Sequence, residues 1–442
     1  MDENELMGSM KVSKAVAKMA IPSVISSLVT VVYNMADTFF VGQTGNPLQV
    51  AAVSQTNPIF ILFMAFANMF GMGGSAAASM ALGEKKEKRV KQVSSFITYA
   101  SLIVGIVFAV ILLDGMQPVL QLFGADADTY ELAKGYTTYI SYGAPFIIWS
   151  AAASFVVRAD GASREAMTGS MIGTVANIIL DPIFISGFGM GAAGAAIATT
   201  IGNIMASVYY LWYFCRKSRN MSMAFRYFKC GDRILSQVCS AGLPTAIFSA
   251  LMSISTIILN QILVAYGNAP VAAIGIVFKA NMFITFLQMG LANGVQPLLG
   301  YSYGAGNRER FIAVERYTKK CCLIVGVLAT ALFFFFREPI IRLFISDTEV
   351  INYGVEMLIA YMISGPVIGI LFMNMNCMQS TGNALPATIL SILRQGVLLI
   401  PVLYGLNALL GLHGVIYGQA LTDYVAVLLS IVIWRWKRRK TL

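Results

Sequence analysis

Long apolar stretches recur along the whole chain and are separated by short polar connections. Each stretch has about twenty residues or more, which is the length of an α-helix that crosses a lipid bilayer. The pattern therefore predicts an all-α membrane protein with about twelve spanning helices. The expected spans cover residues 15–42, 50–82, 91–113, 130–157, 164–187, 190–214, 235–266, 270–303, 314–336, 350–380, 386–410 and 413–436.

Composition supports this prediction, because 57% of the residues are hydrophobic and only 12% are charged. A soluble protein carries roughly twice that share of charge. No polar stretch is long enough to form a separate soluble domain. The acidic start of the chain is not followed by a small-residue cleavage site, so we expect the first span to act as its own insertion signal.

Basic residues are concentrated in every second connection and at both ends of the chain. Such positively charged loops stay on the cytoplasmic side of a membrane. This predicts that both termini are cytoplasmic and that the number of spans is even. Because the clusters lie in short loops between membrane helices, we expect no nucleic-acid partner. The clusters lie in residues 11–18, 85–91, 158–164, 216–233, 308–320 and 435–440.

The two halves of the chain look like copies of one another. Gly304 follows Gly83 by 221 residues, and Pro366 follows Pro145 by the same offset. Two repeats of six helices enter the membrane from the same side, which relates them by an axis along the membrane normal and leaves a cavity between them. We expect a first lobe in residues 1–215, a linker in 216–234 and a second lobe in 235–442.

Two acidic residues lie inside spans of the first half. Asp37 lies 19 residues beyond Lys18 in the first span, and Asp181 lies 17 residues beyond Arg164 in the fifth. The two acids therefore share a similar depth. A carboxylate at membrane depth costs about 3 kcal/mol on insertion scales, so a chain that keeps one there usually binds or moves an ion with it. Asn177 precedes Asp181 by one helical turn and shares its face.

Two carboxylates in one low-dielectric pocket do not both ionise freely, so the pair can hold a proton. With Asn177 and Thr199, the same oxygens offer the hard donors that Na⁺ requires. Tyr136 and Tyr139 lie at a comparable depth. A structural alternative stays open for each residue: an interhelical hydrogen bond or a helix end for the acids, a bond to its own helix for the threonine, and packing for the tyrosines.

The second half lacks this pair of acids. Asp423 lies within the twelfth span, while Lys279 and Arg394 are charged residues within the eighth and eleventh. These three residues either neutralise one another or line a substrate cavity. We place Asn34, Asn203, Lys279, Asn374 and Asp423 as candidates for the cavity lining, together with methionine and aromatic side chains that adapt to varied shapes.

Enzyme motifs are weak or missing. Residues Gly300 to Gly304 fit the Gly-x-Ser-x-Gly elbow of serine hydrolases, but that elbow needs a preceding strand and a histidine base, and His413 is the only histidine. No Gly-Lys dipeptide of a phosphate loop exists. We therefore expect a protein that is not an enzyme and has no cofactor, and whose energy comes either from an ion gradient, with H⁺ or Na⁺ as the coupling ion, or from a partner. The six cysteines include no Cys-x-x-Cys pair and are expected to be reduced.

Three motifs in the first half resemble the multidrug and toxic compound extrusion (MATE) family. They are the Asp-Thr-Phe-Phe-Val-Gly run at 37–42, the Asn-Ile-Ile-Leu-Asp-Pro run at 177–182 and the Gly/Ala-rich run at 191–199. The resemblance covers nearly the whole chain. It implies that Asp37, Asn177, Asp181 and Thr199 form the ion site, as in the bacterial branch that relies on first-lobe acids. A sodium-coupled branch instead uses acids in spans seven and ten, and this chain has none at the middle of those spans.

The resemblance further implies an antiporter of the bacterial inner membrane, and we expect it to be a monomer. It would export small organic, often cationic, compounds in exchange for protons or sodium, with membrane lipid as its surroundings. The alternative function is a flippase for a lipid-linked precursor on a related two-lobe scaffold. A flippase would carry more basic charge in its lumen, and Lys279 with Arg394 keeps this alternative open. A membrane enzyme and a channel are more remote alternatives.

Overall fold

The computed structural model describes residues 3–42 and 46–441, and these fold almost entirely into helices. The helices are α1 (Glu3–Gly8), α2 (Val12–Gly42), α3 (Pro47–Gly83), α4 (Glu87–Asp114), α5 (Met116–Leu122), α6 (Tyr130–Ala159), α7 (Ser163–Pro182), η1 (Ile183–Gly187), α8 (Gly191–Arg216), η2 (Phe225–Tyr227), α9 (Ile234–Val264), α10 (Asn268–Gly304), α11 (Arg308–Phe335), α12 (Arg337–Arg342), α13 (Thr348–Ile363), α14 (Gly365–Ser380), α15 (Ala384–Ile392), η3 (Leu393–Val397), α16 (Leu399–Leu410) and α17 (Leu412–Thr441).

The predicted number of spans agrees with these helices. Within the described ranges, eleven helices are long and apolar enough to cross a membrane, and α13 with α14 forms a twelfth, bent by 45°. Pro366 stands in the first turn of α14, where its ring prevents the preceding residues from continuing one straight helix. The sequence pattern predicted one continuous span there. The Gly300–Gly304 motif lies inside α10, so the strand that a hydrolase elbow needs is missing.

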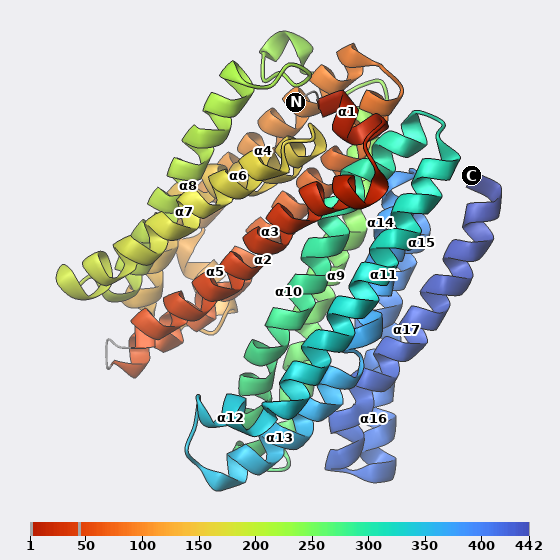
Figure 1. Ribbon diagram of the computed structural model, residues 1–442. Helices are drawn as coiled ribbons and strands as arrows, with labels where there is room; N and C mark the ends of the chain where they lie inside the picture. The colour runs from red at the N-terminus through yellow and green to blue at the C-terminus, as the bar shows by residue number, and fades with distance from the viewer. Residues whose placement is uncertain (1–2, 43–45, 442) are drawn as a thin grey trace.

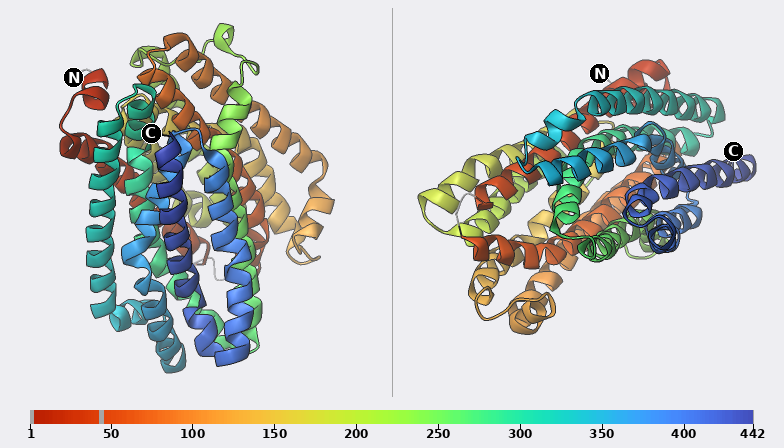
Figure 2. Two further views of the ribbon diagram at one scale, coloured as in Figure 1. Left: turned by 90° about the vertical axis from the view of Figure 1, so that its right-hand side faces the viewer. Right: turned by 90° about the horizontal axis from the view of Figure 1, so that it is seen from below.

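The helices form two lobes that converge at one end and diverge toward the other (Figures 1 and 2). Helices α2 to α8 build the first lobe, and α9 to α17 build the second. The lobes meet at the end that carries α1, the C-terminus and the long connection between α8 and α9. We call this the basic end, because the lysine- and arginine-rich connections lie there, and we call the other the opposite end.

Glycines allow the two lobes to touch at the basic end. A Cβ added at Gly73 of α3 would lie 1.9 Å from the carbonyl oxygen of Val238 in α9. One added at Gly242 would lie 1.8 Å from the carbonyl oxygen of Met69. The helix backbones are therefore in direct contact, as small residues permit between membrane helices. We call this contact the interlobe seam.

The interlobe seam includes a second backbone contact, between α3 and α10. It is made by two glycines that occupy equivalent positions in the two halves of the chain. A Cβ at Gly83 would lie 2.2 Å from the oxygen of Tyr301, and one at Gly304 would lie 2.1 Å from the oxygen of Met80. At this end, each lobe also contributes the start of one helix to the hydrophobic core of the other lobe. The start of α2 packs into a core of the second lobe, and the start of α9 packs into a core of the first.

The short helix α1 is fastened to the second lobe. The guanidinium of Arg310 in α11 donates to the carbonyl oxygens of Met7 at 2.8 Å, Met10 at 2.7 Å and Leu6 at 3.2 Å. The Leu6 and Met7 carbonyls lie in the last turn of α1 and have no intrahelical partner, so the arginine satisfies them. Although α2 belongs to the first lobe, the segment just before it is therefore held by the second.

The connection between the lobes is anchored on the first lobe by Asp160. This buried carboxylate accepts hydrogen bonds from Tyr213 at 2.8 Å, Ser218 at 2.6 Å and Asn220 at 3.0 Å. Burial raises the pKa of Asp160, while the three donors oppose that shift. The connection is thus an ordered part of the first lobe at the basic end.

Candidate functional site

A buried polar network joins α7 to α8 in the first lobe. With the amide of Asn177 oriented to suit both neighbours, its Nδ2 donates to Asp181 Oδ2 at 3.0 Å. Its Oδ1 accepts from Thr199 Oγ1 at 3.1 Å and from the Thr199 backbone N–H at 2.9 Å. The side chains of all three residues are buried, and that of Asp181 is 0% exposed.

Local backbone features place these three side chains within reach of one another. Gly173 and Gly202 face each other where α7 and α8 cross, and a Cβ at Gly202 would lie 2.5 Å from the oxygen of Gly173. This close approach brings Asn177 to Thr199. Beyond the acid, Pro182 ends the regular helix, and the π-helical turn η1 follows. Such π-turns are frequent at functional sites.

Asp37 approaches this network from α2. Its carboxyl group is close enough to Asp181 for the two charges to interact, and both also interact with the phenol of Tyr136. The Tyr33 hydroxyl, one turn before Asp37, lies 3.4 Å from Thr199 Oγ1. The structure thus brings together the two acids that the sequence placed at one depth. We call Tyr33, Asp37, Asn177, Asp181 and Thr199 the acid cluster.

One oxygen in the acid cluster has no partner. Within the described ranges, Asp181 Oδ1 is buried and receives no hydrogen bond. An unsatisfied buried carboxylate oxygen is costly unless it gains a proton or a cation. The surrounding hydroxyl, amide and carboxyl oxygens are donors of the kind that Na⁺ prefers, and they are equally able to stabilise a protonated carboxyl group. The cluster therefore presents the groups that a bound proton or small cation would require.

The remaining first-lobe candidates have different surroundings. Tyr136 is half-buried beside the acids, whereas the side chain of Tyr139 is 37% exposed and its backbone oxygen accepts a hydrogen bond from Thr200. Within the described ranges, the Tyr139 side chain forms no hydrogen bond with the acid cluster, so it does not join it. The amide of Asn203 donates to the backbone oxygen of Thr199 at 2.8 Å and accepts from the Ser150 hydroxyl at 2.9 Å. These two hydrogen bonds connect Asn203 to the network. Asn34 is half-buried on α2.

Comparison with known proteins places this chain in a family. The family model described as MatE matches residues 22–183 and 244–404, one segment in each lobe. The chain belongs to the MATE family. The multidrug export protein MepA of Staphylococcus saprophyticus is 32% identical over 96% of this chain and 93% of its own length. MepA of Staphylococcus aureus is likewise 32% identical over 96% of this chain and 93% of its own length.

Solved transporter structures share the whole fold. A structure described as the outward-facing conformation of a multidrug resistance MATE family transporter superposes with a TM-score of 0.93, at 25% identity over 99% of this chain and 98% of its own. A transporter from Pyrococcus furiosus, described as having a binding pocket of reverse polarity, gives 0.92 at 26% identity over 98% and 97%. This chain is therefore a multi-pass membrane transporter with the MATE two-lobe fold. Its curated relatives are bacterial multidrug transporters.

In the second lobe of this MATE protein, Asp423 is engaged in a buried ion pair. It accepts from Arg394 Nε at 2.8 Å, and also from Ser364 at 2.8 Å and Gln419 at 2.9 Å. The guanidinium of Arg394 lies over the ring of Phe248 at 5.3 Å and over that of Phe372 at 5.7 Å. Both ends of the pair are buried inside the lobe. Asp423 therefore does not line an open cavity here, contrary to its placement among the cavity candidates.

The other second-lobe candidates are not part of this pair. Asn374 is fully buried and donates to Ser430 at 2.9 Å, so it too faces the interior of the lobe and not a cavity. Lys279 is half-buried and forms no ion pair within residues 3–42 and 46–441. The sequence grouped Lys279 with Arg394 and Asp423 because all three lie in spans, but only the latter two are paired.

The ion pair gives a test of its structural role. We expect Asp423→Asn to destabilise the protein by about 3 kcal/mol or more, because it leaves a buried guanidinium without a counter-charge. The double variant Arg394→Met with Asp423→Leu should recover most of that loss. Thermal unfolding in detergent measures the stability, and dye efflux by the double variant measures function. A stable double variant without efflux would show that the pair serves transport directly.

Proposed function

We propose that this protein exports organic, mainly cationic, compounds in exchange for H⁺ or Na⁺ that binds at the acid cluster. The observation that carries the proposal is the buried Asp181, which has an unpartnered oxygen and the charge of Asp37 beside it. Such a site favours uptake of one positive charge. The membership in the MATE family and the names of the multidrug export relatives support the export of organic compounds.

The proposed orientation places the basic end in the cytoplasm. Lysine and arginine are concentrated in the connections at that end, as expected for loops on the cytoplasmic side. The interlobe seam then closes the cytoplasmic side, and the lobes diverge toward the outside (Figure 1). The high similarity to a structure described as outward-facing supports this assignment.

In the proposed cycle, an external cation binds the acid cluster while the lobes diverge outward. Because Asp37 and Tyr33 belong to α2, neutralising the acids changes how α2 packs against α7 and α8. That change weakens substrate binding, and the lobes rock to face the cytoplasm. There the substrate binds as the cation leaves. Linkage requires that the substrate and the coupling cation each weaken the binding of the other.

The flippase alternative receives less support from the second lobe. Arg394 is held by Asp423 and by two aromatic rings, so it is not available to bind the phosphates of a lipid-linked precursor. Lys279 then remains as the single basic candidate from the earlier list. We therefore favour the antiporter, acting as a monomer without a cofactor other than its coupling ion.

A vesicle experiment tests the antiport. The purified protein is reconstituted, the membrane potential is clamped, and movement of the dye ethidium is followed under an imposed pH gradient, an imposed Na⁺ gradient or neither. We expect ethidium to move against one of the two gradients, and we expect the matching ion to be released when ethidium is added. Protein-free vesicles serve as the control. Dye movement that responds to neither gradient would contradict the proposal.

A further inference from the structure

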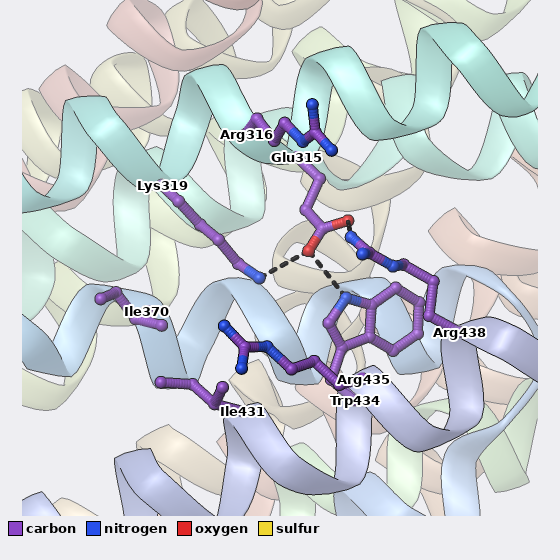
Figure 3. A pocket seen from close by; sticks show the side chains of 8 residues that line it. All are labelled: Glu315, Arg316, Lys319, Ile370, Ile431, Trp434, Arg435 and Arg438. Carbon is purple, nitrogen blue, oxygen red and sulfur yellow. Dashed lines mark hydrogen bonds and ion pairs between the residues drawn. The ribbon is translucent and has the colours of Figure 1, made fainter.

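A pocket outside the acid cluster lies near the basic end of the second lobe. It has a volume of about 380 Å³ and is formed between α11, α14 and α17 (Figure 3). Its lining contains four cationic side chains, one acidic one, one tryptophan and two isoleucines. They are Glu315, Arg316, Lys319, Ile370, Ile431, Trp434, Arg435 and Arg438.

Glu315 organises the centre of this pocket. Its buried carboxylate accepts from Lys319 Nζ at 2.6 Å, from Trp434 Nε1 at 2.7 Å and from Arg438 at 3.3 Å (Figure 3). One negative charge thus holds two cations and the indole in place. The bonds join α11 to α17, so the pocket wall is preorganised.

Two further cations of the pocket have no partner. The guanidinium groups of Arg316 and Arg435 are exposed, and neither forms a hydrogen bond or ion pair within the described ranges. Four cations around one carboxylate leave a net charge of about +3 at full ionisation. The pocket is therefore an electropositive site that an anion would complete.

The depth of the pocket identifies the kind of anion. Along α11, the exposed side chains beyond the pocket are apolar, beginning with Leu323 and Ile324. Along α17, the exposed Leu428 and Val432 give way at the pocket to Arg435 and the exposed Trp436. This change from apolar to basic and aromatic residues marks the level of lipid headgroups.

The geometry points to a binding site for an anionic phospholipid in this pocket. The phosphate would be held by Arg316 and Arg435, beside the cations already fixed by Glu315. The acyl chains would continue over Ile370 and Ile431 toward the apolar faces of α11 and α17. Basic pockets between membrane helices at this level favour anionic headgroups. A free anion would gain the charge contacts but not the apolar ones.

Native mass spectrometry of the purified full-length protein tests this inference. The protein is titrated with phosphatidylglycerol and, separately, with phosphatidylcholine carrying the same acyl chains. The pocket variant combines Arg316→Gln with Arg435→Gln. The control variant combines Lys320→Gln with Arg439→Gln, which removes the same charge from exposed positions of the same two helices outside the pocket lining.

We expect the native protein and the control variant to retain phosphatidylglycerol over phosphatidylcholine. The pocket variant should bind phosphatidylglycerol about thirtyfold more weakly, since each surface cation contributes modestly and two are lost. Equal thermal stability of the two variants without lipid verifies that both are folded. Equal losses in both variants, or no loss in either, would overturn the inference. Displacement of the lipid by millimolar inorganic phosphate would also overturn it, because the pocket would then be a free-anion site.

Discussion

Asp37→Asn is expected to lower dye efflux to the level of cells without the transporter, a decrease of at least about tenfold. The amide cannot take up a proton or supply a negative charge to Na⁺, so the acid cluster loses the charge that attracts the coupling ion. Asp37 and Tyr33 share one face of α2 and face Thr199 and Asp181, so this loss also removes the link between ion binding and the position of α2. Dye accumulation in single cells measures the effect.

The matched control for this variant is Asp114→Asn. Asp114 is exposed at the last residue of α4 in the same lobe, and the change removes the same charge without touching the acid cluster. We expect the control to retain full efflux. Protein levels in the membrane must be equal for all three forms. Full efflux by Asp37→Asn at equal protein levels would remove Asp37 from the coupling mechanism.

Gly73→Ala is expected to open the interlobe seam. The added methyl carbon would lie 1.9 Å from the backbone oxygen of Val238, so α3 and α9 must separate. Overpacking of this kind costs about 2 kcal/mol, which raises the population of the open seam roughly thirtyfold. The cost falls mainly on the state in which the seam is closed. Efflux should fall as well, because the cycle requires that state.

Cys239 offers a native probe for this prediction. It follows Val238 in α9 and is half-buried at the seam, so its alkylation by a maleimide should become faster when the seam opens. The measurement uses protein in which the other five cysteines are replaced by serine. Gly275→Ala is the control, since a Cβ at Gly275 of α10 would meet no atom within 4 Å. An unchanged alkylation rate in Gly73→Ala would contradict the prediction. It would mean that the added methyl group is accommodated while the interlobe seam stays closed.

The fold could be predicted from the sequence because its signals are local or periodic. Apolar length alone located the spans, and the repeat predicted two similar halves. The bend between α13 and α14 was not predicted, since Pro366 in a span can either kink a helix or begin one. Which outcome occurs depends on packing against α10 and α11, which the spacing of residues does not reveal.

The acid cluster was predictable only in part. Two carboxyl groups at one depth are conspicuous because charge is rare in spans, and the structure brings Asp37 and Asp181 together. Tyr33 was missed, although its position one turn before Asp37 on the same helix face was an available signal. The partner of Asp423 could not be chosen from the sequence, because Arg394 and Lys279 were equivalent until the helices were packed.

The attachment of α1 to Arg310 has a consequence for biosynthesis. Met10 and Arg310 are 300 residues apart, so α1 leaves the ribosome long before the helix that holds it has been made. Helix α2 must insert long before its preceding segment can settle. Docking of α1 is therefore among the last events of assembly, and protection of residues 3–10 from an added protease would report a completely folded molecule.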